Sequence, residues 1–512
     1  MYPIIIYSSS GCLSVTDGLF AFLPAGGKMI SGSKSPEVCR TLPVTRKRGA
    51  MIFKQFHNES LGHASYFIGS EMSGEALALD IRRDVDVYFD EARSQGMHIA
   101  YAADTHQHND YVSGIREISS RSQVRVLAGF NASVGYYATK LNDGEKFRMG
   151  EVSFEVLHTP GHTPEHICLV VTDLSRGEEP ALVLSGGCLL VGDVGRPDLL
   201  GGNEAAAAHA VELWHSLNDR LMKLPDHVEV YPTHVAGSLC GGNIGSRLSS
   251  TIGYERRLNS WLNDLGLEKF IERSVAAENL PAIPPYWRHM RQLNQEGPPL
   301  LGVLREPPAL DVGEFDRLRN EGIYVLDCRS PEAFSVHIPG ALHAGAGTSF
   351  PTWAGTVLPF GQPYVLVLES AKDLWNTCWH LLRIGYGLPH GWLAGGMMAW
   401  RTSGKEIGLM PMLTVGGLRD EMDRRKDLFV LDVRQPREWA TGHVPGASHI
   451  AGAEISDRLA EVPQGRPLAI ICGSGYRSSA VASLLRNRGY NDVYNVLGGM
   501  RAWRRSGFRT VR

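Results

Sequence analysis

An internal repeat in the C-terminal half of the chain most constrains its fold. One matching pair is "VLDCRSPEAFSVHIPGA" at 325–341 and "VLDVRQPREWATGHVPGA" at 430–447; a second is "WLAGGMMAW" at 392–400 and "VLGGMRAW" at 496–503. The offset of about 105 residues is too long for a solenoid and suits tandem small domains. Each copy alternates apolar strand-like runs with helical patterns. Each therefore predicts an α/β unit with a parallel sheet.

The remaining length leaves room for a further domain. The chain has 512 residues, and about 100–200 residues per domain suggests three domains. From Met51 onward, short apolar strands alternate with turns, and helical patterns lie near 84–95 and 205–222. This order predicts a layered αββα core. A Pro-rich segment around 279–302 marks a boundary. We therefore predict an α/β multidomain chain with domains at 51–285, 296–405 and 411–512.

Composition excludes several classes of function. The chain is 43% hydrophobic and 21% charged with a net charge of −3, and it has no long run of one sign. We expect no nucleic-acid partner and no membrane partner. Eight cysteines are scattered without CxxC pairs, which predicts free thiols in a reducing, cytoplasmic compartment. The oligomeric state stays open, a homo-oligomer included.

Residues 1–50 make a poor signal peptide, because no basic residue precedes their apolar part. We expect an extension that is disordered or lies upstream of the natural start. Met51 is that expected start, since "MIFKQF" opens an alternating, strand-like pattern.

A cysteine lies at the end of an apolar strand in the second copy. The strand "PLAIIC" (467–472) is followed by the loop "GSGYRSSA" and a helical pattern. Backbone N–H groups of such a loop and the positive helix end converge on the sulfur, which lowers the pKa of the thiol and stabilises a bound anion. Arg477 adds a fixed positive charge. We predict that Cys472 is a nucleophile for covalent sulfur transfer.

The first copy lacks this cysteine. Its corresponding strand ends in Glu369 and Ser370, while Cys328 and Cys378 lie away from the start of the loop. A carboxylate at 369 would repel a persulfide anion. We therefore predict an inactive first copy.

Histidines follow apolar strands in the N-terminal half. The turn "THQHNDY" supplies His106, His108 and Asp110, and later loops supply His162 and His234. Side chains at i, i+2 and i+4 of a turn after a strand can converge on one ion. The pattern predicts descent from a metal site.

Both C-terminal copies resemble rhodanese domains. The second carries "DVRQPREWATGHVPGA", "CGSGYRSS" and "LGGMRAW" in the expected order. The resemblance implies that Cys472 carries a sulfane sulfur and that thiosulfate or sulfite is a partner. It also implies that the six-residue loop 472–477 forms the sulfur pocket, with Gly473, Ser474, Gly475, Tyr476 and Arg477.

Residues 51–280 resemble the metallo-β-lactamase superfamily, with the glyoxalase II and persulfide dioxygenase branch closest. The stretches "IRRDVDVYFDEA", "GDVGRPDLL", "AGSLCGG" and "SSTIGYERRLN" are similar to those of bacterial persulfide dioxygenase–rhodanese fusions. The resemblance implies an enzyme of sulfide detoxification. In that family a mononuclear Fe(II), held by two histidines and one aspartate, oxidises a low-molecular-weight persulfide, such as that of glutathione or coenzyme A, to sulfite. The histidines map to His106 and His162.

The aspartate of that set maps to Gly187, and Tyr111 replaces the usual histidine after Asp110. Two neutral imidazoles leave the charge of a dication uncompensated. An external anion or the persulfide sulfur of the substrate could fill the position, or Asp193 could swing in.

Further alternatives stay open for this domain. His106, His108 and His162 could form a three-histidine Zn(II) site, as in a hydrolase of the glyoxalase II type. A metal-free scaffold could also present substrate to Cys472. Arg196 in "GRPD" is a candidate to clamp a carboxylate of the thiol carrier, and a structural pair with Asp198 is the alternative.

Overall fold

The computed structural model describes residues 49–263, 266–276 and 280–512. The extension expected over 1–50 lies outside the described residues except for its last two positions. Within the described part, no helix is long and apolar enough to cross a membrane. The six cysteines described, from Cys168 to Cys472, are all free thiols.

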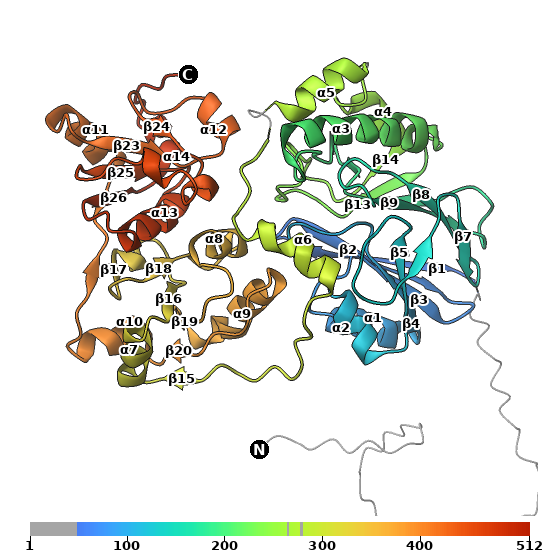
Figure 1. Ribbon diagram of the computed structural model, residues 1–512, viewed down its shortest axis with the longest axis horizontal. Helices are drawn as coiled ribbons and strands as arrows, with labels where there is room; N and C mark the ends of the chain where they lie inside the picture. Colours follow the sequence, from blue (N-terminus) through green and yellow to red (C-terminus); the bar gives the residue numbers. More distant parts are fainter. Residues whose placement is uncertain (1–48, 264–265, 277–279) are drawn as a thin grey trace, which may run out of the picture. The chain divides into compact units, whose positions relative to one another are not determined.

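Two six-stranded sheets form the N-terminal region (Figure 1). The first sheet has the order β1 (Met51–Asn58), β2 (His63–Ser70), β3 (Glu75–Leu79), β4 (His98–Ala103), β5 (Arg125–Gly129) and β6 (Thr139–Leu141). The second has the order β14 (Ser250–Thr251), β13 (Glu229–Pro232), β10 (Leu182–Gly186), β9 (Ile167–Asp173), β8 (Val152–His158) and β7 (Lys146–Met149). A small hairpin of β11 (Leu189–Leu190) and β12 (Asp193–Val194) follows β10.

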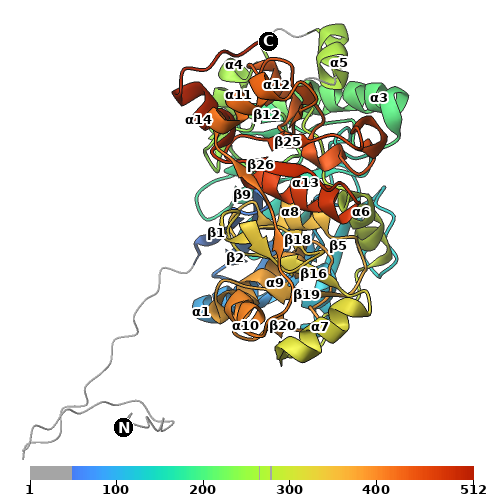
Figure 2. The same cartoon turned by 90° about the vertical axis from the view of Figure 1, so that its left-hand side faces the viewer.

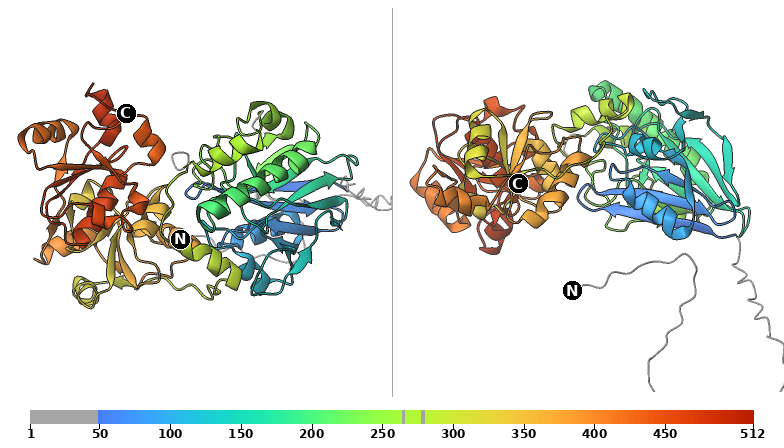
Figure 3. Two further views of the ribbon diagram at one scale, coloured as in Figure 1. Left: turned by 45° about the horizontal axis from the view of Figure 1, so that its top comes forward. Right: turned by 90° about the horizontal axis from the view of Figure 1, so that it is seen from below.

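The two sheets are stacked, with helices on their outer faces (Figure 3). Alternate residues of one strand enter different cores, as in β2. Tyr66 and Ile68 lie between the sheets, whereas Phe67 packs in the cluster that includes Tyr88 and Ala92 of α1 (Asp86–Gln95) and Ile115 and Ile118 of α2 (Ile115–Arg121). On the second sheet, Val170 and Val183 pack with residues of α3 (Gly202–His215) and α5 (Leu267–Val275). Both faces of each sheet are therefore buried, which explains the nearly continuous apolar strands. The predicted αββα architecture is confirmed.

The C-terminal half contains two parallel five-stranded sheets of the same strand order. The first has the order β15 (Ala309–Leu310), β20 (Trp392–Leu393), β19 (Tyr364–Val367), β16 (Tyr324–Asp327) and β18 (Leu342–His343). The second has the order β22 (Met412–Leu413), β26 (Val493–Val496), β25 (Leu468–Ile471), β23 (Phe429–Asp432) and β24 (Ser448–His449). A short antiparallel pair, β17 (Val336–His337) and β21 (Gly408–Leu409), accompanies the first sheet. The predicted parallel α/β units are confirmed.

Helices flank both sheets, and Figure 2 shows α13 running past β26. The first copy contains α7 (Val312–Asn320), α8 (Phe350–Val357), α9 (Leu374–Arg383) and α10 (Gly396–Thr402). The second contains α11 (Val415–Arg424), α12 (Pro436–Ala440), α13 (Tyr476–Asn487) and α14 (Gly499–Arg505).

The repeat motifs build the same local structure twice. In each copy a buried arginine donates hydrogen bonds to the aspartate two residues before it, Arg329 to Asp327 and Arg434 to Asp432. Capping is also repeated at one helix start: Asp311 accepts from the backbone of Glu314 before α7, and Thr414 accepts from that of Gly417 before α11. These contacts explain why the motif residues recur at a fixed offset.

The segment predicted as a boundary contains a helix, α6 (Trp287–Glu296). Trp287, Met290 and Asn294 are buried along one face of it. This face lies against the histidine-bearing turn 106–113, where Asn294 donates to the carbonyl oxygens of His108 and Tyr111. A further short helix, α4 (Ile252–Leu258), follows β14.

Candidate active sites: a cysteine loop and a histidine cluster

Cys472 directly follows β25 and lies at the start of the loop that leads into α13. Its Sγ is 3.2 Å from the backbone nitrogen of Gly475, which donates to it, and 3.4 Å from Oγ of Ser478. Gly475 has φ = 104°, a conformation that suits glycine and aims this N–H inward. The hydroxyl of Ser478 donates to Oδ1 of Asn495 at 2.6 Å. One backbone N–H therefore donates to the sulfur, where the sequence predicted several backbone groups.

The loop lines a cavity of about 480 Å³. Gly473, Ser474, Tyr476 and Arg477 contribute to its wall, and Arg501 and Arg504 of α14 add positive charge. Trp353 of the first copy and Leu239 of the N-terminal region complete the enclosure. The cavity therefore suits a small anion.

Arg477 forms an ion pair with Glu438 at the edge of the loop. Its Nη1 and Nη2 lie 2.5 and 2.7 Å from the two carboxylate oxygens. Burial alone would raise the pKa of Glu438, yet these hydrogen bonds hold that pKa below its usual value. Arg477 is thus fixed in orientation while it borders the cavity.

The first copy has no comparable thiol at its loop. Glu369 is exposed and lines a separate cavity of about 630 Å³. Cys328 and Cys378 are buried in the apolar core, and burial raises the pKa of Cys378 to about 12. Burial also raises the pKa of Cys328.

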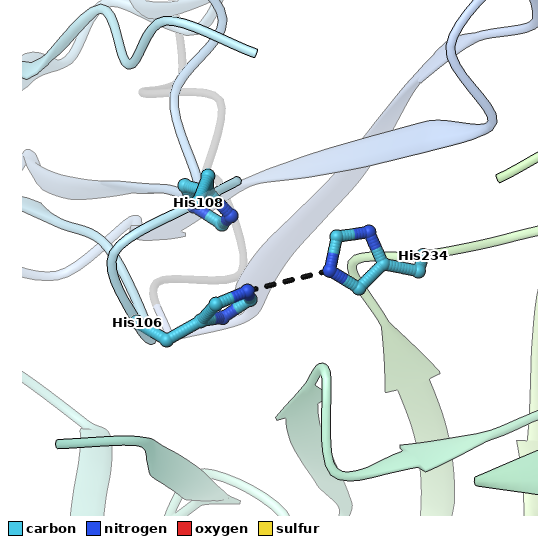
Figure 4. Close-up of side chains that lie close together, drawn as sticks. All are labelled: His106, His108 and His234. Atoms are coloured by element: carbon cyan, nitrogen blue, oxygen red, sulfur yellow. Dashed lines mark hydrogen bonds between the residues drawn. The ribbon is translucent and has the colours of Figure 1, made fainter. Parts of the chain in front are cut away.

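The predicted histidines converge from different strand ends (Figure 4). His106 and His108 follow β4, His162 follows β8 and His234 follows β13, and all four are buried. The ring centroid of His106 lies 4.3 Å from that of His108, 4.9 Å from that of His162 and 5.3 Å from that of His234. Possible ligand atoms of His106, His108 and His234 lie within 4.8 Å of one another. Asp110 lies beside this group, with Oδ2 at 3.4 Å from Nδ1 of His234.

Hydrogen bonds fix the tautomers of two histidines. The Nδ1 of His162 lies 3.0 Å from the carbonyl oxygen of Arg196, so Nδ1 must carry the proton and donate. The hydroxyl of Thr105 donates to Asp80 and therefore accepts from Nδ1 of His106 at 2.9 Å. Both rings thus direct the lone pair of Nε2 toward the cluster. Metal-binding histidines commonly have this arrangement, because a hydrogen bond from the other ring nitrogen fixes the tautomer and the orientation of the ring.

The spacing of the nitrogens fits a bound cation. Nε2 of His106 lies 3.3 Å from Nε2 of His234, and two nitrogens on one tetrahedral ion lie roughly 3.4 Å apart at metal–nitrogen distances of about 2.0–2.1 Å. Within the described residues, Nε2 of His162 is buried without a hydrogen-bond partner. An orphaned polar atom of this kind is rare unless it binds something.

Electrostatics keep two of these imidazoles neutral and favour protonation of a third. Burial, reinforced by the neighbouring histidines, lowers the pKa of His106 and of His162 well below the usual range. Burial opposes protonation of His234, but Cys240 and Asp110 raise the pKa of His234 well above its usual value. Burial opposes ionisation of Asp110, but the adjacent His234 holds the pKa of Asp110 at about 2. A metal binds imidazole in its neutral form, so a metal at this cluster would displace the proton of His234.

Gly187 leaves no space for the carboxylate that the family resemblance implies. A Cβ atom at this position would lie 2.4 Å from Cδ2 of His162 and 2.8 Å from its Nε2. The ring of His162 therefore occupies the space where an aspartate side chain would begin.

Asp193, one of the substitutes predicted from the sequence, lies in another network, whereas His108 stays in a possible ligand group. The carboxylate of Asp193 accepts from the backbone nitrogens of Asn243 and Val194, and it is absent from the described ligand groups. His108 directs Nε2 to Asp80 at 3.2 Å. In the ligand group that contains His106 and His108, the third member is His234 instead of His162.

Arg196 forms structural contacts. Its Nε and Nη2 donate to Asp198 at 2.8 and 2.6 Å, and its Nη1 donates to the carbonyls of Leu239 and Pro281. This geometry favours the structural alternative over a clamp for a thiol carrier, because the donors are engaged within the protein.

Cys240 is a site residue that was not predicted from the sequence. Its sulfur and ligand nitrogens of His162 and His234 lie within 4.8 Å of one another, and all three residues are buried. The available signal was its position six residues after His234 in a Gly-rich loop.

Comparisons with known proteins agree with both halves of the structure. The rhodanese-like domain family matches residues 311–403 and 414–506. The thiosulfate sulfurtransferase GlpE of Pseudoalteromonas translucida is 34% identical over 83 residues, which are 16% of this chain and 79% of that protein. The mitochondrial persulfide dioxygenase ETHE1 of Mus musculus is 28% identical over 218 residues, 41% of this chain and 74% of that protein.

A solved structure covers more of the chain. The metallo-beta-lactamase from Staphylococcus aureus is 30% identical, with a TM-score of 0.60, over 67% of this chain and 99% of that one. Fold and site thus define a metallo-β-lactamase-fold protein that carries rhodanese-like domains. The chain belongs to the fusions in which an ETHE1-like region precedes two rhodanese-like domains.

Proposed function

We propose that this chain is a sulfur-metabolism enzyme that handles low-molecular-weight persulfides. The observation that carries the proposal is the placement of Cys472, whose sulfur accepts a hydrogen bond from the backbone N–H of Gly475 beside an arginine-lined cavity. The sulfurtransferase and persulfide dioxygenase among its relatives support the same area of metabolism.

Sulfur transfer at Cys472 proceeds in two displacements. The thiolate attacks the sulfane sulfur of thiosulfate, the S–S bond breaks, and sulfite leaves with the electron pair. The cysteine then carries a persulfide, whose terminal sulfur a thiolate or sulfite removes, restoring the thiolate. The backbone N–H of Gly475 stabilises the anionic sulfur, and Arg501 and Arg504 attract the anionic substrate.

The N-terminal cluster would hold one divalent metal through His106, His162 and His234. We propose Fe(II), with Zn(II) as the alternative that a hydrolase would use. Bound iron would activate O₂ toward a persulfide such as that of glutathione or coenzyme A, so that persulfide, O₂ and water give thiol, sulfite and two protons. Thr105 and Arg196 hold the rings of His106 and His162 with Nε2 facing inward.

Cysteine variants test the transferase half. Cys472→Ser should abolish thiosulfate:cyanide sulfur transfer, because the alkoxide of serine is not formed at neutral pH. Cys328→Ser and Cys378→Ser should retain the activity, since both thiols are buried in the first copy. Transfer that survives in Cys472→Ser would overturn this half of the proposal.

Metal analysis tests the other half. Near-stoichiometric iron in the purified protein, with O₂ uptake on glutathione persulfide, is the expected result. Bound zinc together with thioester hydrolysis would support the hydrolase instead of the dioxygenase. Absence of bound metal would contradict both proposed activities.

A further inference from the structure

Cys240 contributes a third kind of donor to the histidine cluster. Its Sγ lies within 4.8 Å of ligand nitrogens of both His162 and His234. The thiol is fully buried. It comes from the loop after β13, so it reaches the cluster from a different segment than the 106–110 turn.

We propose that Cys240 replaces the missing carboxylate, with its thiolate binding the metal together with His162 and His234. This rests on the proposed metal site and specifies its ligands. Two independent features point to a ligand position here: the sulfur lies within 4.8 Å of ligand nitrogens of two histidines, and Nε2 of His162 is buried without a hydrogen-bond partner among the described residues.

Charge balance favours the thiolate. A metal binds imidazole in its neutral form, and Gly187 supplies no anion. Apart from Asp110 beside His234, nothing in the group would then offset the charge of a dication. A thiolate neutralises one of its two charges. The thiol proton passes to solvent as the sulfur–metal bond forms, and no oxidant or reductant is needed.

Arg196 aligns the two ligand positions. Its backbone N–H donates to the carbonyl oxygen of Cys240 at 3.2 Å, while its own carbonyl oxygen accepts from Nδ1 of His162 at 3.0 Å. Its side chain also donates to the carbonyl of Leu239, next to Cys240. One residue therefore holds both His162 and Cys240 in place, which lowers the reorganisation needed for binding.

Cobalt(II) is the probe for the test, bound to the full-length protein. A thiolate ligand gives intense near-ultraviolet charge-transfer absorption that nitrogen and oxygen ligands do not give. X-ray absorption of the zinc-loaded wild type should show one sulfur at about 2.3 Å. This second measurement needs no variant and so does not depend on how well a mutant folds.

Cys240→Ser should lose the charge-transfer band. Its zinc affinity, measured by chelator competition, should fall by about 10- to 100-fold or more, because even partners one step removed from a metal change affinity by that factor. Cys188→Ala is the matched control, since Cys188 is equally buried beside Gly187 but lies outside the ligand groups of the described residues.

The outcomes separate the two proposals. Cobalt binding without the band, or a band that persists in Cys240→Ser, overturns the role of Cys240 while the metal site stands. A wild-type protein that binds neither cobalt nor zinc overturns the metal site and the ligand assignment together.

Discussion

At the scale of single residues, Gly187 has two consequences: it supplies no carboxylate ligand, and it leaves room for the ring of His162. The ring of His162 lies where the first side-chain atom of residue 187 would be. The absence of a Cβ therefore permits the position of His162 as well as removing a carboxylate. An aspartate at 187 could restore the ancestral ligand only if the ring of His162 moved.

Gly187→Ala should weaken metal binding without adding or removing any polar group. The methyl carbon would meet the His162 ring at 2.4 Å and push Nε2 away from the cluster. We expect zinc affinity to fall by about 10- to 100-fold, measured by chelator competition. Gly177→Ala is the control, because a Cβ there meets no atom within 4 Å. Unchanged affinity in Gly187→Ala would show that His162 is not a ligand.

At the scale of elements, α6 supports the histidine-bearing turn. The side chain of Asn294 donates to the carbonyl oxygens of His108 and Tyr111 and accepts from the backbone nitrogen of Ser113. Tyr286, just before the helix, donates to the carbonyl oxygen of Asp110. A segment whose proline content suggests a linker thus fixes the backbone of the site.

Asn294→Ala should destabilise the chain and loosen the metal site together. Removing the amide leaves buried carbonyl and N–H groups unpaired, which costs about 1–3 kcal/mol of unfolding free energy. Thermal unfolding and metal content would both fall. Gln292→Ala on the exposed face of the same helix should change neither, since its amide only contacts Glu296. Equal effects from the two variants would contradict the supporting role of Asn294.

At the scale of the whole molecule, the first rhodanese-like copy contributes to the site of the second. Trp353 of α8 lines the cavity beside the Cys472 loop, together with Ser349 and Thr352. Its indole lies against Gly452 of the second copy, where a Cβ would approach the ring to 2.6 Å. A copy without a cysteine at its loop therefore forms part of the cavity beside the Cys472 loop.

Trp353→Ala should raise KM for thiosulfate while kcat changes little. The substitution opens one wall of the cavity but leaves the contacts to the sulfur of Cys472 in place. A tenfold rise in KM corresponds to about 1.4 kcal/mol. Trp392→Ala is the control, because Trp392 lies in the same copy and lines the other cavity. A fall in kcat with an unchanged KM would refute the proposed role of Trp353 in the cavity wall.

Much of this architecture could be predicted from the chain. The duplicated motifs indicated two parallel α/β units, and the buried Asp327–Arg329 and Asp432–Arg434 pairs explain why these motifs are so regular. The apolar strands indicated a layered core, because strands whose two faces are both covered are apolar along most of their length. The sequence pattern predicted the structure wherever residues of one short segment contact one another.

The parts that escaped prediction depend on contacts between distant segments. Cys240 and His162 are 78 positions apart, and Arg196 contacts both. The sequence predicted a boundary around 279–302, whereas the structure has the helix α6 there, whose buried face contacts the histidine-bearing turn. Arg196 itself has a motif that suggests substrate binding, and only the folded chain shows its donors engaged by Asp198 and two carbonyls.

The loop at 237–240 joins the two chemistries through adjacent residues. Leu239 borders the cavity beside the Cys472 loop, and Cys240 belongs to the histidine group. The Cα atoms of such neighbours are only about 3.8 Å apart. An insertion or deletion of a single codon here would displace the boundary of one pocket and a candidate ligand of the other in the same step. The length of this loop therefore couples the geometry of the cavity beside Cys472 to that of the histidine cluster.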